Sequence, residues 1–334
     1  MNPAAELLGE DARIVASAYA GLSEGAYRLG DIEAALSALQ HAPDTIDTRY
    51  YQGLALARKG QHEQAAQALR DVLRLDPDHR GALQNLARVL SALGLEEERR
   101  RRLDRFQELY EKDERRKALR VRVRDLRLEA ERRAGAGDVA GAAAAAEEAS
   151  RLAPDDTEVL VELGERLLQT GNRARAEEVF SIVLKRDPLN ASAHYALGRI
   201  KAEGGSLDEA LFLLQRAAGL EPMSLPYHTY LGQMLLRLKR LDEGVRELQL
   251  AQRLNPDSAE GAFNLGLALA QAGELKAAAE QMEAAVALGY RQPQIHMALA
   301  QVYRALGDTV RAAAEQAIFE RVNRETPFGE NPRK

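Results

Sequence analysis

Apolar residues recur along the chain at helical spacing, in short segments that come in pairs. In residues 157–190 the first segment places leucines three and four apart, on one face of a helix: Leu160, Leu163, Leu167 and Leu168. A second segment of the same kind follows: Ala176, Val179, Phe180 and Val183. Gly171 separates the two segments, and Pro188 ends the second because proline disfavours helical geometry in the residue before it. The pattern predicts two antiparallel helices.

This two-helix pattern repeats every 34 residues to the end of the chain. Five blocks begin at Thr157, Ala191, Leu225, Ala259 and Pro293. Leucine holds the seventh place of each block, and glycine or alanine holds the eighth. Glycine holds the fifteenth place in four blocks and Lys239 in the other, and three blocks have proline at the thirty-second. A fixed period of this length indicates stacked units whose core lies between neighbours.

Four earlier blocks follow the same template. They begin near Ala16 and at Ile46, Arg80 and Val123, and the first is about four residues short at its end. The sequence therefore predicts nine repeats in an all-α chain.

These residues resemble the tetratricopeptide repeat: Leu-Gly at places seven and eight, Ala at twenty and Pro at thirty-two, with Phe263-Asn264-Leu265-Gly266 close to the consensus. The resemblance covers nearly the whole chain, although the tryptophan expected at place four is absent. It implies an α-solenoid, a right-handed superhelix of helix pairs whose first helices line a concave groove. It does not imply a substrate. Because a stack of repeats offers an extended surface, we expect a scaffold that binds a partner protein.

The period fails once, between the blocks at Arg80 and Val123, where the spacing is 43 residues. Residues 95–134 there contain no glycine or proline, so nothing in them requires a helix to break. Seven acid-to-base pairs at i,i+4 support an exposed helix: Glu96–Arg100, Glu97–Arg101, Glu98–Arg102, Glu108–Lys112, Glu111–Arg115, Asp113–Lys117 and Glu129–Arg133. We expect one charged helix of about 60 Å at about 1.5 Å per residue.

The expected organisation has four parts. Residues 16–110 form an N-terminal arm of three repeats, and residues 123–326 form a C-terminal arm of six. Residues 95–134 form the long charged helix that repeats three and four share, and residues 327–334 form a flexible tail. Two apolar stripes are expected to pack this helix against its neighbours: Leu103, Phe106 and Tyr110, then Leu119, Val123, Leu126 and Ala130.

The resemblance places a set of aromatic and amide side chains in the groove. The C-terminal arm contributes Tyr195, Arg199, Tyr230, Gln233, Phe263, Asn264, Met297 and Gln301, and the N-terminal arm contributes Tyr50, Tyr51 and Asn85. Aromatic anchors beside amides suit an extended or helical peptide. The alternative is that these rings fill gaps between helices. The lysine and asparagine with which some family members bind a C-terminal carboxylate are missing from the matching places.

A second function rests on the long helix. Lys112, Arg116, Arg120 and Arg124 lie at i,i+4 spacing and form a basic stripe for an acidic protein or nucleic acid. A solvated, ion-paired helix is the favoured interpretation, because acids are interleaved with the bases and stacking aromatics are missing. The net charge of −5 also disfavours nucleic acid.

The remaining composition excludes most chemistry. The chain has no cysteine, no phosphate-binding loop and no hydrolase motif, so we expect no enzyme activity, cofactor or metal. His194, His228 and His296 share place four and are interpreted as packing residues. No apolar run of membrane-spanning length and no signal segment occur, which favours the cytoplasm, and the preference for arginine over lysine favours a bacterial source. Ile318, Phe319 and Val322 make the C-terminal end a candidate contact for a homo-oligomer.

Overall fold

A computed structural model describes residues 3–325 of the chain, and all regular structure in that range is helical. The predicted tail, residues 327–334, lies outside the described residues. No helix within the described range is both long and apolar enough to cross a membrane. The chain divides into two units, Met1–Val121 and Arg122–Lys334, which are treated separately below.

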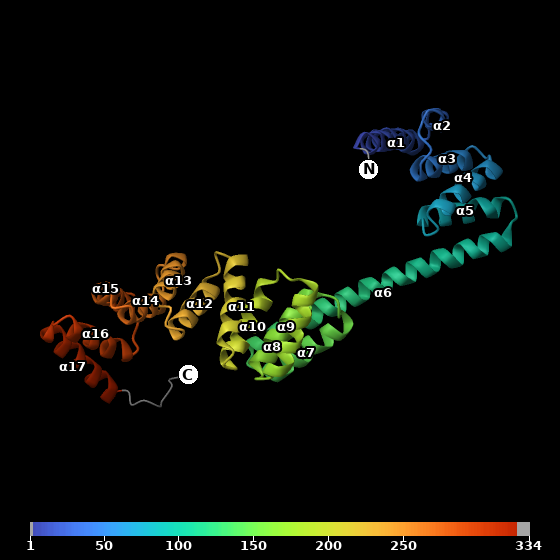
Figure 1. Cartoon of the computed structure of the whole chain (residues 1–334). Helices are drawn as coiled ribbons and strands as arrows, with labels where there is room; N and C mark the ends of the chain where they lie inside the picture. The colour runs from blue at the N-terminus through green and yellow to red at the C-terminus, as the bar shows by residue number, and fades with distance from the viewer. Residues whose placement is uncertain (1–2, 326–334) are drawn as a thin grey trace. The chain divides into compact units, whose positions relative to one another are not determined.

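Helix pairs stacked in sequence order build the first unit (Figure 1). Its helices are α1 (Pro3–Leu29), α2 (Ile32–Gln40), α3 (Ile46–Arg58), α4 (His62–Leu75), α5 (Arg80–Ala92) and the first part of α6 (Glu96–Gly135). The first helices of successive pairs, α1, α3 and α5, also contact one another.

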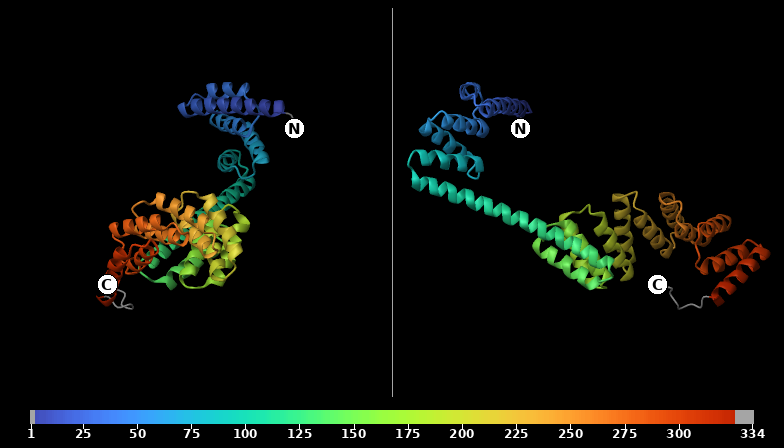
Figure 2. Two further views of the ribbon diagram at one scale, coloured as in Figure 1. Left: turned by 60° about the vertical axis from the view of Figure 1, so that its left-hand side comes forward. Right: turned by 180° about the vertical axis from the view of Figure 1, so that it is seen from behind.

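The second unit continues the same arrangement, which can be followed from two further sides in Figure 2. Beyond the last part of α6 its helices are α7 (Val139–Leu152), α8 (Thr157–Gln169), α9 (Arg173–Arg186), α10 (Ala191–Glu203), α11 (Leu207–Leu220), α12 (Leu225–Arg237), α13 (Leu241–Leu254), α14 (Ala259–Gln271), α15 (Leu275–Ala287), α16 (Gln294–Ala305) and α17 (Thr309–Glu325). The predicted all-α solenoid of helix pairs is confirmed.

The small residue at place eight sits where the two helices of a pair cross most closely. A Cβ atom added at Gly164 of α8 would lie 2.5 Å from the Phe180 ring of α9, and one at Gly266 of α14 would lie 2.7 Å from Met282 Cγ of α15. Both distances are shorter than van der Waals contact. Glycine at this place therefore lets a large side chain of the second helix lie directly against the backbone of the first.

The turn within each pair requires a left-handed residue at place fifteen. Glycine supplies it in eight turns of the described chain, among them Gly171 with φ 78° and Gly205 with φ 85°. Lys239, with φ 61°, is the exception and the sole non-glycine residue with positive φ among residues 3–325. A side chain in this conformation costs about 1–2 kcal/mol because Cβ approaches the backbone.

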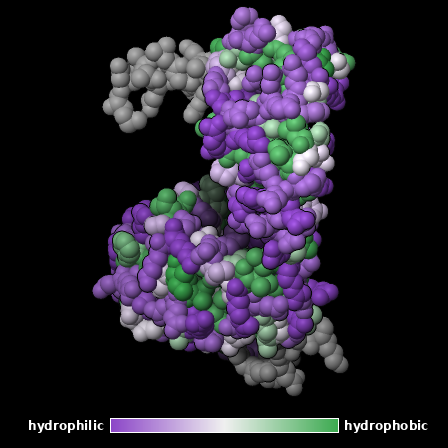
Figure 3. Space-filling view, turned by 90° about the vertical axis from the view of Figure 1, so that its right-hand side faces the viewer, coloured by the Kyte–Doolittle hydropathy of each residue, from purple (hydrophilic) through white to green (hydrophobic). Residues whose placement is uncertain are grey.

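The hydrophobic core runs through the stack and leaves mainly polar side chains outside, as the face shown in Figure 3 illustrates. One cluster of the second unit joins Leu248, Phe263, Leu265, Met282 and Ile295, which come from four successive helices. Each repeat therefore completes the core of the next, as expected for a solenoid.

Helix α6 packs through residues that the sequence pattern identified only in part. In the first unit Phe106 and Leu109 contact the core, and Leu109 is 8% exposed. Leu103 is 37% exposed and Tyr110 50%, so the predicted stripe is right for Phe106 and wrong for Leu103 and Tyr110. Side chains on one face of a helix recur at spacings of three or four residues. The buried residue after Phe106 is Leu109, three places on, and not Tyr110, four places on; both Phe106 and Leu109 pack with residues of α4 and α5.

In the second unit the last part of α6 follows its predicted stripe more closely. Val123, Leu126 and Ala130 are buried, whereas Leu119, which lies in the first unit, is 41% exposed. Arg127 extends from this part of the helix and donates to both carboxylate oxygens of Glu162 on α8. The helix is thus held by apolar contacts on one side and by an ion pair beside them.

We predict that Lys239→Gly stabilises the protein. Glycine removes the steric cost of the left-handed backbone, and its greater freedom in the unfolded chain offsets part of that gain, so the expected net effect is about 0.5–1 kcal/mol. Urea unfolding of the full chain measures it. Lys276→Gly is the matched control: Lys276 is an exposed lysine in the first turn of α15, where the backbone is helical, so glycine should not stabilise the protein.

Glu98 gives the first unit a pH-dependent contribution to stability. The Glu98 carboxylate lies 2.6 Å from the Arg70 guanidinium on α4 and 3.1 Å from that of Arg102. The hydrogen bond from Arg70 is the main cause that lowers the pKa of Glu98 to about 2. Because the unfolded pKa is higher, near 4.5, this contribution is complete above that pH and is lost as the pH falls toward 2.

We therefore predict that Glu98→Gln lowers the free energy of unfolding most at neutral pH. The difference from the unchanged protein should narrow between pH 5 and pH 2, as followed by urea unfolding across that range. Glu97→Gln is the control, because Glu97 is 94% exposed and its nearest cation, Arg101, is 3.6 Å away. A difference for Glu98→Gln that stays constant with pH would contradict the assignment.

Candidate partner-binding groove

The second unit brings three tyrosines together on the first helices of consecutive repeats. The ring of Tyr195 on α10 lies 4.7 Å from that of Tyr227 and 5.8 Å from that of Tyr230, both on α12. Tyr227 is buried, and its hydroxyl shares a hydrogen bond with Ser192. Tyr195 and Tyr230 remain partly exposed, and burial raises the pKa of Tyr195. Two of the residues that the resemblance places in the groove, Tyr195 and Tyr230, are therefore neighbours.

Arg199 lies one turn beyond Tyr195 and completes this group. Its guanidinium carbon is 5.5 Å from the centre of the Tyr195 ring and 5.7 Å from that of the Tyr230 ring. A cation this close to two aromatic faces is held in place by their quadrupoles, at about 0.5–1 kcal/mol for each contact.

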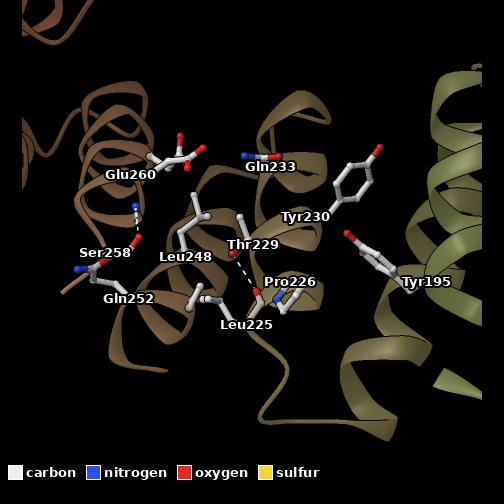
Figure 4. A pocket seen from close by; sticks show the side chains of 13 residues that line it. Tyr195, Leu225, Pro226, Thr229, Tyr230, Gln233, Leu248, Gln252, Ser258 and Glu260 are labelled. Atoms are coloured by element: carbon white, nitrogen blue, oxygen red, sulfur yellow. Dashed lines mark hydrogen bonds between the residues drawn. The ribbon is translucent and has the colours of Figure 1, made fainter. Parts of the chain in front are cut away.

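An open cavity of about 270 Å³ lies beside the tyrosines, between α12, α13 and α14. Figure 4 shows Tyr195 and Tyr230 at one end, Glu260 at the other, and Thr229, Gln233 and Leu248 between them. Leu225, Leu248 and Ala251 give it an apolar wall, while Gln233 and Asn264 add amides. Such a mixture can bury an apolar side chain and hydrogen-bond the backbone that carries it.

Two further cavities continue from the first along the same face. The second is lined by Arg237, Lys239 and Gln271, and shares Gln233, Leu248 and Asn264 with the first. The third begins at Leu267 and Gln271 and reaches Gln301 on α16. We call these three connected cavities the groove. Five of the predicted residues line it: Tyr195, Tyr230, Gln233 and Asn264 in the first cavity, and Gln301 in the third.

Phe263 and Met297 are placed differently from these residues. Phe263 is 7% exposed, and its ring stacks on Tyr290 with centroids 4.6 Å apart. It fills space between helices, as the alternative interpretation of the rings required. Met297 is 39% exposed but does not line the three cavities.

The predicted residues of the first unit bind one another. The Asn85 amide donates to the Tyr50 hydroxyl at 3.1 Å, and Tyr50 lies against His79 and Tyr51. A Cβ atom at Gly81 would lie only 2.5 Å from the Tyr50 hydroxyl oxygen. Burial and a hydrogen bond to Glu24 raise the pKa of Tyr51 to about 12. These rings are therefore part of the packing between α3 and α5.

The basic stripe is exposed. Lys112, Arg116 and Arg120 are in no ion pair within residues 3–325, whereas their neighbours Arg115 and Lys117 pair with Glu111 and Glu114. Arg124, in the second unit, contacts Asp125 at 3.3 Å.

The three place-four histidines hold loops and helices together. His194 and His228 each place Nε2 3.0 Å from a proline carbonyl in the preceding loop, that of Pro188 or Pro222. Nδ1 of His228 and of His296 lies close to a carboxylate of the same repeat, Glu247 at 2.6 Å or Glu315 at 2.7 Å. Across residues 3–325 no group of three or more metal-ligating side chains comes together.

Sequence reasoning missed the walls of the groove. Leu248, Ala251 and Gln252 belong to the second helix α13, and Ser258 and Glu260 to the start of α14. The repeat template assigns the groove to first helices only, so it contains no signal for a second helix that reaches the same cavity.

Comparison with known proteins identifies the class of protein to which the chain belongs. Tetratricopeptide repeat models match residues 47–79, 161–222, 231–293 and 263–323, more than half of the chain. The chain belongs to the tetratricopeptide repeat family, whose members are protein-interaction modules. No curated protein matches its sequence significantly.

Solved structures show the same fold at low identity. PilF of Pseudomonas aeruginosa is 17% identical with a TM-score of 0.55, and the match covers 64% of this chain and 95% of PilF. YrrB is 20% identical with a TM-score of 0.51, over 55% of this chain and 95% of YrrB. At these identities the likeness concerns the fold alone.

Proposed function

We propose that the protein binds a peptide segment of a partner protein in the groove of the second unit and thereby supports assembly of a protein complex. The observation that carries this proposal is the continuity of three cavities with amides at intervals along them. Gln233 and Asn264 lie where the first two cavities meet, and Gln271 lies where the second meets the third.

The side chains of the groove match the chemistry of a peptide. A peptide backbone offers a donor and an acceptor at each residue, and an amide side chain can satisfy either. Leu225, Leu248 and Ala251 provide an apolar wall for one side chain, and Tyr230 closes its end. YrrB, which shares the fold, has an unusual peptide-binding site. That likeness makes peptide binding a reasonable expectation, although the residues that carry it here are this chain's own.

We predict that Tyr230→Ala and Gln233→Ala each weaken binding of the natural partner about tenfold, or about 1.4 kcal/mol. A photo-reactive amino acid at Gln233 captures the partner from the native cell, and mass spectrometry maps the attached segment. Titration of that segment with the purified variants then gives the affinities.

Gln215→Ala is the matched control for Gln233→Ala. Gln215 is an exposed glutamine on α11 that lines none of the three cavities. Undiminished affinity in both groove variants, or equal capture from positions 215 and 233, would show that the partner binds elsewhere.

The unpaired cations on α6 support a second candidate function, docking of nucleic acid or an acidic protein through the basic stripe. Exposed cations without carboxylate partners are the sites that phosphates neutralise with release of counterions. Three of the four stripe residues, Lys112, Arg116 and Arg120, have this character.

If the stripe binds nucleic acid, its affinity for a duplex should fall steeply as salt rises. Replacing Lys112, Arg116 and Arg120 with serine should then reduce the slope of log affinity against log salt by about 3, since each phosphate contact contributes about 0.9. Fluorescence anisotropy with labelled DNA and RNA at several salt concentrations measures both. Serine at Arg115, Lys117 and Arg122, which have carboxylate partners, is the control. No salt-sensitive binding would exclude the nucleic-acid form of this function.

A further inference from the structure

The groove contains cations for which the described chain supplies no carboxylate. Arg237 and Lys239 line its second cavity, and Arg199 lies against Tyr195 and Tyr230, which line the first. None of these three cations is in an ion pair within residues 3–325. The arginine next to them behaves differently, because Arg240 binds Glu243 at 2.7 Å. Cations left unpaired inside a recess are available to a ligand.

Arg199 is arranged to receive a planar anion. The rings of Tyr195 and Tyr230 hold its guanidinium, and its buried Nε atom has no hydrogen-bond partner within the described chain. A guanidinium is more weakly hydrated than an ammonium and presents a rigid fork of donors that fits a carboxylate. Its orientation is fixed before a ligand arrives, which reduces the entropic cost of binding.

Lys239 is a second unpaired cation of the groove, and its backbone conformation is unusual. Every other described turn of its kind has glycine at this place, yet Lys239 adopts φ 61° there. Unfavourable backbone conformations persist at sites where they contribute to function. The strained residue lines the second cavity together with Arg237.

The charge of the groove is opposite to that of the chain. Its three cavities are lined by Arg237 and Lys239 against a single carboxylate, Glu260, and Arg199 adds a third cation at the tyrosine end. The whole chain has a net charge of −5. Tyr230, whose ring Arg199 contacts, and Arg237 are seven residues apart on α12, which corresponds to about 10 Å along the helix. About three residues of extended peptide span that length.

We propose that the groove selects an acidic, extended peptide, with one carboxylate side chain on Arg199, a second near Arg237 and Lys239, and an apolar side chain between them in the first cavity. This inference rests on the proposed function and adds the class of ligand. A peptide fits better than a nucleic acid, because the wall between the cations is apolar and one carboxylate faces the same cavity.

Two peptide libraries test this selection on the full chain. Both are blocked at the two ends, so that no terminal charge takes part, and both have leucine fixed at the centre. The other positions are drawn from Asp, Glu, Ser and Gly in one library and from Asn, Gln, Ser and Gly in the other. Fluorescence anisotropy gives the affinities, and single-stranded RNA of mixed sequence is the third probe.

We expect the acidic library to bind at least about tenfold more tightly than the amide library. Arg199→Gln and the pair Arg237→Gln/Lys239→Gly should each remove most of that preference, while Arg199→Lys retains part of it. Arg216→Gln is the matched control, since Arg216 is an exposed, unpaired arginine on α11 that lines none of the cavities. Thermal unfolding of each variant establishes that the fold is kept.

Three results would overturn the inference. Equal binding of both libraries, weakened in each case by Gln233→Ala, would mean that the groove binds peptides without selecting charge, and the proposed function would stand. Tighter binding of RNA than of the acidic library, lost in the same variants, would assign the cations to phosphate. Binding of neither library would exclude acidic peptides as the ligand, and titration of the natural partner would decide the proposed function separately.

Discussion

The close crossing of the two helices in each repeat is the contact on which the rest of the fold depends. Where Gly164 or Gly266 leaves out a Cβ atom, Phe180 or Met282 lies directly on the backbone of the first helix. The two helices of the repeat then lie close together, and the faces that they turn away from each other can pack against the next repeat. Because each crossing recurs at the same place, first helices come to lie beside one another, and their outward side chains form one surface.

That regularity explains which parts of the site could be predicted. Tyr195 and Tyr230 hold neighbouring places in successive blocks, so a constant 34-residue period is enough to make them neighbours. The same reasoning places Gln233 and Asn264 together. The period does not predict the position of the Phe263 side chain. Phe263 holds the same place in its block as Tyr195, but its ring stacks on Tyr290, which lies in the loop between α15 and α16.

Contacts that depend on the choice of rotamer were harder to predict. Glu96 pairs with Arg99 rather than Arg100, and Asp113 pairs with Arg80 of another helix. Spacings of three and four are nearly equivalent on a helix, so the tertiary neighbour decides between them. The same ambiguity explains why Tyr110 was predicted to pack in the first unit, where Leu109 is the buried residue. The role of α6 as a bridge between repeats three and four remains a prediction.

Departures from the repeat carry information that the repeat itself does not. A stack requires leucine, small residues and a left-handed turn, and these requirements explain most of each block without reference to a ligand. Lys239 departs from them, because glycine would form the same turn without the cost of about 1–2 kcal/mol. Arg199 likewise has a buried Nε atom for which the described chain supplies no hydrogen-bond partner, and an uncharged residue would avoid that cost. Two such residues along one groove are difficult to explain by folding alone, and a ligand that supplies the missing negative charge accounts for both.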